Sequence, residues 1–280
     1  MTALNTFKMY RYQLLPIDRH TGDLYDGRTT QELIQQKNEI FAKAIPFIRT
    51  YRHRGSGLSV RIDSSNNSAF VLSIASQRAL TRETPDFRVE QVDNWPHTVA
   101  IVLNREDEQY VAVQDRPSAF ASTDTVINLI EKATRTSLAK AGLRVHFERM
   151  FHQSYFWSIV ADYRDRITLV GFDFVTPNMA NISNTLSDTL KRLAKDTNTA
   201  ESNLQLRSDP ASALELRTDD ETVQGLVDYT SEGGGDIYLK VKGIRKRIHT
   251  SHSTREIQID DLELSGSTDQ LAVVIRKLLK

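Results

Sequence analysis

The feature that most constrains the fold is a run of strand-like segments in the first half of the chain, with no helical pattern between them. Apolar residues mark five such segments, at residues 58–62, 69–75, 87–92, 97–103 and 110–114. Short polar turns separate several neighbouring pairs, which is typical of hairpins. Because the strands follow one another instead of alternating with helices, the sequence predicts an antiparallel meander within an α+β fold.

Helical patterns flank this run on both sides. Thr29 and Glu32 have the spacing of a capping box, and an amphipathic segment follows them to residue 48. Ser122 or Thr123 caps a second amphipathic segment, for which Gly142 is a natural stop. We expect these helices to pack on one face of the sheet.

The remainder of the chain predicts a smaller α+β part. Residues 167–175 are mostly apolar and predict a central strand, and helical spacing returns at 182–193. We place a soft boundary where the strand gives way to this helix. The sequence therefore predicts a strand-rich domain at 1–178 and a smaller α+β domain at 179–280, which carries a basic hairpin.

Composition excludes several classes of protein. The 280 residues contain 36 Lys and Arg against 36 Asp and Glu, so a nucleic-acid surface requires segregation of charge, not an excess of it. The absence of cysteine excludes disulfides, thiolate zinc sites and cysteine nucleophiles. The N-terminus has no signal-peptide pattern, and no uncharged apolar run reaches the length of a membrane span. We expect a cytoplasmic protein.

The clearest functional signal is residues 233–255, GGGDIYLKVKGIRKRIHTSHSTR, which we call the basic ribbon. Alternation puts Ile237, Leu239 and Val241 on one face of a strand. The opposite face and the segment after it carry Tyr238, Lys240, Lys242, Arg245, Lys246 and Arg247. Cations beside an aromatic side chain are typical of phosphate-backbone binding. The alternative is a solvated edge hairpin, whose lysines prevent strand-to-strand aggregation.

A second basic stretch follows the first helix. Arg49, Arg52 and Arg54 lie in the segment IRTYRHRGSG, which contains no acid. If this loop lies beside the basic ribbon, the two make one groove for a polyanion. The alternative is an ordinary surface loop, in which cations favour the negative end of the helix dipole.

Catalytic signals are few. Asp86, Glu90 and Asp93 on or beside a predicted strand suggest a metal-dependent nuclease, but Val92 stands where a lysine is required. Arg247 and His252 have the Arg-x4-His spacing of HEPN ribonucleases, although this stretch reads as strand and turn, not helix. No nucleophile elbow, dinucleotide fingerprint or kinase signature is present. We predict no catalytic residue, no metal and no cofactor.

The chain also resembles the RexA family of phage-exclusion sensors and, more loosely, KwaB-type antiphage proteins. The resemblance lies in the helix-like segment LKRLAKD at 190–196, the short strand LQLRSD at 204–209 and the strand–turn–helix pattern at 99–130. It implies a cytoplasmic homodimer that binds DNA without much sequence preference and signals to a separately encoded membrane effector. It carries no catalytic motif onto this chain.

These observations predict a non-enzymatic nucleic-acid-binding sensor of bacterial antiphage defence, with DNA favoured over RNA. The five ribbon cations would contact phosphates, assisted by Arg49, Arg52 and Arg54, and Tyr238 would stack on a base or pack against a sugar. Two alternatives stay open: a metal-dependent nuclease acting through Asp86 and Glu90, and a protein-interaction module that binds no nucleic acid.

Overall fold

The computed structural model describes residues 4–17, 29–53, 57–65, 67–175, 199 and 201–279. The fold is α+β, as the sequence predicts. The chain divides into two compact units made of interleaved segments. The first unit comprises Met1–Lys8, Gln35–Arg144 and Glu256–Lys280, and the second comprises Met9–Ile34 and Val145–Arg255.

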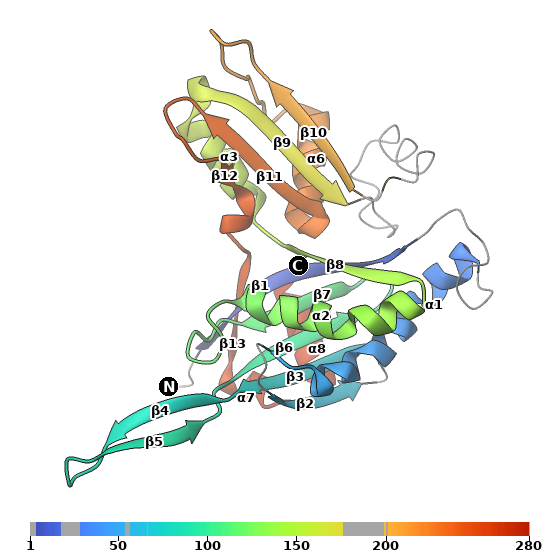
Figure 1. The fold of residues 1–280 in the computed structure, drawn as a ribbon. Coiled ribbons are helices and arrows are strands. Elements are labelled where there is room, and N and C mark those ends of the chain that lie inside the picture. The colour runs from blue at the N-terminus through green and yellow to red at the C-terminus, as the bar shows by residue number, and fades with distance from the viewer. Residues whose placement is uncertain are drawn as a thin grey trace. The chain divides into compact units, whose positions relative to one another are not determined.

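An antiparallel sheet forms the framework of the first unit (Figure 1). Its strands are β1 (Leu4–Pro16), β2 (Leu58–Ser65), β3 (Ala69–Ser76), β6 (His97–Asn104), β7 (Gln109–Gln114), β8 (Leu143–Arg149) and β13 (Glu256–Asp260). The order is β13-β1-β7-β6-β3-β2, with β8 also paired to β1. The residues of β1 from Met9 onward and those of β8 from Val145 onward belong to the second unit. The meander β2, β3, β6 and β7 confirms the predicted hairpin run.

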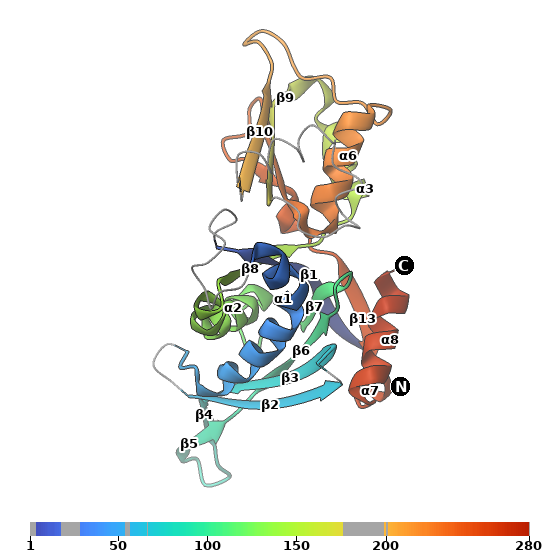
Figure 2. The same ribbon diagram turned by 90° about the vertical axis from the view of Figure 1, so that its right-hand side faces the viewer.

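Helices cover both faces of this sheet (Figure 2). They are α1 (Thr30–Ala44), the 3-10 turn η1 (Ile45–Thr50), α2 (Thr123–Lys140), α7 (Asp261–Leu264) and α8 (Thr268–Leu279). The predicted helices α1 and α2 share one face, and the C-terminal α8 packs on the other against β2, β3 and β6. Their starts follow the sequence signals, since Thr29 and Glu32 form the capping box and Ser122 accepts from the Thr125 amide.

The sequence predicts only one of the two strands of a further hairpin. Strands β4 (Arg78–Glu83) and β5 (Val89–Asn94) form a separate two-stranded sheet, of which only β5 was expected. Every residue of β4 is exposed, so no alternation of buried and exposed positions marks it. Phe87 at its turn is 93% exposed.

The second unit contains a four-stranded antiparallel sheet in the order β10-β9-β11-β12. The strands are β9 (Ile167–Val175), β10 (Glu201–Arg207), β11 (Gly235–Val241) and β12 (Ile248–His249). The accompanying helices are α3 (Gln153–Asp162), η2 (Arg164–Arg166), α6 (Glu221–Tyr229), η3 (Thr230–Gly234) and η4 (Thr250–His252). Apolar residues of α3 and α6 pack with those of β9 and β11 in one core, which lies on a single face of this sheet.

The chain divides differently from the predicted domains 1–178 and 179–280. Strand β9 cannot end a domain, because both of its edges pair with later strands, β10 and β11. The C-terminal segment returns to the first unit, where β13 pairs with β1. The helix predicted at 182–193 lies outside the described residues. Local sequence patterns do not reveal that a later segment pairs with an early strand. A boundary predicted from such patterns therefore misses this pairing.

A buried lysine on α1 gives a prediction about stability. Lys37 is 2% exposed. Burial lowers its pKa to about 8 from the ordinary 10.5, and the nearby Glu106 carboxylate opposes part of that effect. Below pH 8 the ammonium is charged in both the folded and the unfolded states, and its desolvation opposes folding. Between pH 8 and 10.5 the folded state binds fewer protons than the unfolded state, so stability rises with pH.

We therefore expect Lys37→Met to raise the free energy of unfolding at pH 7 by about 2–3 kcal/mol. The gain should shrink as the pH approaches 10, because the neutral lysine no longer opposes folding. Urea denaturation at pH 7 and pH 9.5 measures both. Lys43→Met is the control on the same helix, where the exposed ion pair with Glu39 should contribute little to stability. A Lys37→Met protein less stable than the parent at pH 7 would contradict this account.

Candidate nucleic-acid interface

Strand β11 has the two-sided character that the sequence predicts. Ile237, Leu239 and Val241 are buried in the core beneath α3 and α6. Because successive side chains of a strand alternate between its faces, Tyr238 and Lys240 lie on the other face. The helices of this unit leave that face uncovered (Figures 1 and 2). The uncovered face is called the open face below.

The start of β11 depends on a glycine. A Cβ atom at Gly235 would lie 1.9 Å from the backbone oxygen of Asp173 on β9. Only glycine permits the two strands to approach this closely. The glycines that begin the basic ribbon therefore belong to a helix-to-strand connection, since Gly233 and Gly234 lie in η3.

The five predicted phosphate contacts are all exposed. Lys240 lies on β11, and the other four lie on the loop that joins β11 to β12: Lys242, Arg245, Lys246 and Arg247. None of the five forms an ion pair with an acid among the described residues. The base of the loop is fixed, because the Arg166 guanidinium donates to the Lys242 carbonyl oxygen at 2.9 and 3.2 Å. Four of the cations therefore lie on a loop whose base is held by Arg166, and the fifth lies on β11. The charges of all five are available to an anion.

Tyr238 has a different role from the predicted base stacking. Its ring is 3% exposed, and a Cβ atom at Gly171 on the neighbouring strand would clash with it. The side-chain amides of Asn203 and Gln205 donate to its hydroxyl oxygen at 2.9 and 2.8 Å. The guanidinium of Arg247 lies 4.5 Å from the ring centroid. Tyr238 thus supports Arg247 from beneath by a cation–π contact instead of meeting a base.

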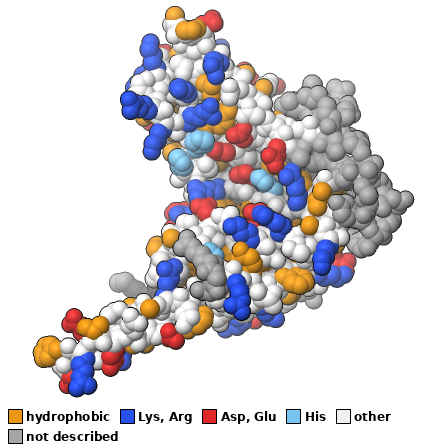
Figure 3. Space-filling model, in the orientation of Figure 1, with side chains coloured by type: hydrophobic (Ala, Val, Ile, Leu, Met, Phe, Trp, Pro, Cys, Tyr) orange, Lys and Arg blue, Asp and Glu red, His pale blue; other side chains and the backbone are white. Residues whose placement is uncertain are grey.

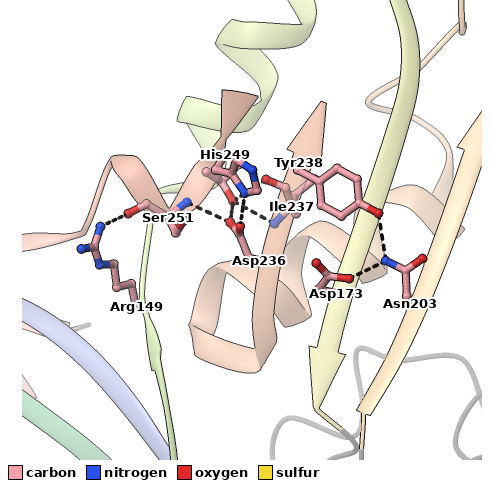
Figure 4. Close-up of polar contacts among 9 residues, drawn as sticks. Arg149, Asp173, Asn203, Asp236, Ile237, Tyr238, His249 and Ser251 are labelled. Atoms are coloured by element: carbon pink, nitrogen blue, oxygen red, sulfur yellow. Dashed lines mark hydrogen bonds and ion pairs between the residues drawn. The ribbon is translucent and has the colours of Figure 1, made fainter. Parts of the chain in front are cut away.

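A carboxylate–histidine contact lies beside Tyr238 (Figure 4). The Nδ1 atom of His249 lies 2.6 Å from Asp236 Oδ2. The other oxygen of Asp236 accepts from Thr250 Oγ1 at 3.0 Å and from the Ser251 amide at 2.9 Å. These contacts hold the segment after β12 against β11. The sequence does not reveal the contact between Asp236 and His249. The two residues come together only because strand pairing sets Tyr238 opposite His249.

Cations and acids lie at opposite ends of the strands on the open face. Strand pairing aligns Arg207, Leu169 and Lys240 in one row, and it aligns Asn203, Asp173 and Asp236 in another. The cationic row lies toward the basic loop, and the acidic row lies toward the opposite end of the strands. Figure 3 shows this separation on the part of the molecule that carries these strands, where Lys and Arg gather toward one end and acids lie mostly toward the other. An extended polyanion would therefore follow the cationic end.

The alignment of the strands adds Arg207 to the predicted phosphate contacts. It is exposed on β10, in the same row as Lys240 of the basic ribbon, with Leu169 between them. The sequence could not indicate this, because only the register of β10 on β9 and of β9 on β11 brings the two cations to one row.

The second basic stretch belongs to the other unit. Arg49 lies in η1 and Arg52 follows it, both exposed, whereas Arg54 lies outside the described residues. The basic ribbon lies in the second unit. The expected joint groove of the two stretches thus stays a prediction, and the interface described above uses residues of the second unit alone.

The carboxylates of the nuclease alternative lie on the exposed β4–β5 hairpin. Glu90 pairs with Arg82 at 3.2 Å, and Asp93 accepts from the Gln77 amide at 3.1 Å. Across the described residues, no group of three or more His, Asp or Glu side chains has an arrangement suited to a metal ion. The structure thus gives this alternative no specific support.

Comparison with known proteins gives no relative: no family model, curated protein or solved structure matches the chain. The resemblance to RexA therefore stays a prediction. In the part of the chain that the structure describes, no helix combines the length and the apolar character needed to cross a membrane.

Proposed function

We propose that this protein binds the phosphate backbone of nucleic acid through the cationic end of the open face. The observation that carries the proposal is the clustering of five exposed ribbon cations, with no acid paired to any of them in the described residues, on one anchored loop and strand. Arg207 extends the cluster across the sheet. Phosphates spaced along a strand are the natural partner of such a row.

Binding of this kind discriminates little between base sequences of the nucleic acid. Lysine and arginine contacts to phosphate position a protein without reporting base identity. Tyr238, the aromatic residue of the cluster, is buried and unable to stack on a base. We therefore propose binding without strong sequence preference. The resemblance to RexA supports DNA as the ligand, a homodimeric state and a sensing role in antiphage defence that is relayed to a membrane effector.

Fluorescence anisotropy with labelled oligonucleotides tests the proposal. Double-stranded DNA, single-stranded DNA and 2′-O-methyl RNA of several unrelated sequences should bind with similar affinity within each class. A protein-interaction module would bind none of them. Strong preference for one sequence would contradict a backbone-directed mode.

A further inference from the structure

The imidazoles beside the cationic cluster have an arrangement that phosphate binding alone does not require. We infer that His249 and His252 form a general acid–base pair that cleaves RNA. This inference rests on the proposed binding of nucleic acid and adds a reaction to it. DNA would be bound at the same face without being cut.

Asp236 orients His249 for proton transfer. Because a carboxylate only accepts, the Nδ1 atom of His249 carries the proton in their 2.6 Å contact. Asp236 is itself held by Thr250 and Ser251, so it cannot swing away from the imidazole. The side chain of His249 is 34% exposed. Its other nitrogen, Nε2, is thereby left in the form that accepts a proton, and Asp236 stabilises the imidazolium that results.

A second imidazole completes the pair. The ring centroid of His252 lies 5.7 Å from that of His249, and His252 is exposed. One phosphate group can contact both rings at this separation. Arg247 lies over Tyr238, whose ring is 5.7 Å from His249. If the same phosphate also reaches the Arg247 guanidinium, that cation would stabilise the charge that develops in the transition state.

RNA is the substrate class because it supplies its own nucleophile. His249 takes the proton from the ribose 2′-hydroxyl as that oxygen attacks the adjacent phosphorus. His252, as imidazolium, donates its proton to the 5′-oxygen as the bond from phosphorus to that oxygen breaks. The products are a 2′,3′-cyclic phosphate and a free 5′-hydroxyl. Proton exchange with water restores both histidines, so atoms and charge balance without a further reactant.

The test uses a DNA oligonucleotide that contains one ribonucleotide, with EDTA present. We expect a single cut after the ribonucleotide, a 2′,3′-cyclic phosphate end by mass spectrometry, and no cut when that position is deoxy or 2′-O-methyl. His249→Gln and His252→Ala should each lower the rate by at least about a hundredfold. His152→Ala, at an exposed histidine before α3, should cut at the parent rate.

Binding of the 2′-O-methyl oligonucleotide is measured in parallel for each variant. Asp236→Asn should keep this binding, lower the rate and alter its pH profile, which a merely structural contact would not do. Binding without cleavage by the parent protein would overturn the acid–base pair and leave the proposed function intact. Full cleavage by both histidine variants would also overturn it. Absence of binding would overturn the proposed function itself.

Discussion

Reversing four cations of the basic ribbon should weaken nucleic-acid binding by at least about a hundredfold, because each surface charge pair contributes about 1 kcal/mol and reversal replaces attraction by repulsion. The variant carries Lys240→Glu, Lys242→Glu, Arg245→Glu and Lys246→Glu. Arg247 is kept, since its contact with Tyr238 belongs to the packing of the open face. All four side chains are exposed, so thermal stability should change little.

A second variant controls for net charge. Arg88, Lys132, Lys140 and Lys277 are exposed cations of the first unit, and replacing them with glutamate changes the net charge equally. Anisotropy titrations should show this variant close to the parent, apart from a small long-range effect that salt screens. Equal losses in the two variants would mean that net charge, and not the ribbon, governs binding. Parent-like binding by the ribbon variant would contradict the assigned interface.

Phe172→Ala should destabilise the second unit by about 3–5 kcal/mol, the usual result of emptying a large buried aromatic site. Phe172 is fully buried on the core face of β9, between Leu204 of β10 and Ile237 of β11. Its ring centroid lies 6.4 Å from that of Phe156 on α3. The cavity would therefore lie directly behind the strands that carry the open face.

Phe87→Ala is the matched control, because the same substitution at a 93% exposed position should change stability by about 0.5 kcal/mol or less. Urea denaturation followed by tryptophan fluorescence compares the two, and Trp157 on α3 packs against the core that Phe172 shares. Similar losses at both positions would contradict the packing described for the second unit.

The sequence predicts those features of the fold that depend on residues close together in the chain. Alternation along β11 identified its buried and open faces, and the hairpin turns identified most of the meander. The capping residues of α1 and α2 were also identified, because such contacts join residues three apart in the chain. Each of these features depends on neighbours that a short window of sequence contains.

The rest depends on register between distant strands. Tyr238 was expected to face a ligand, but the absence of a side chain at Gly171 lets the ring lie down on the sheet. The contact of Asp236 with His249 and the alignment of Arg207 with Lys240 require pairings across β11, β9, β10 and β12. No periodicity encodes those pairings, so the site could be predicted as a basic strand but not as an arranged surface.

The most direct test of the proposed function is the salt dependence of binding by the unmodified protein. Anisotropy titrations with one double-stranded DNA at several salt concentrations give the slope of log Kd against log salt. Six phosphate contacts, from the five ribbon cations and Arg207, predict a rise of about five logarithmic units in Kd per logarithmic unit of salt. The ribbon variant should show a much shallower slope wherever it binds measurably. A flat dependence for the unmodified protein, or no binding at low salt, would contradict the account.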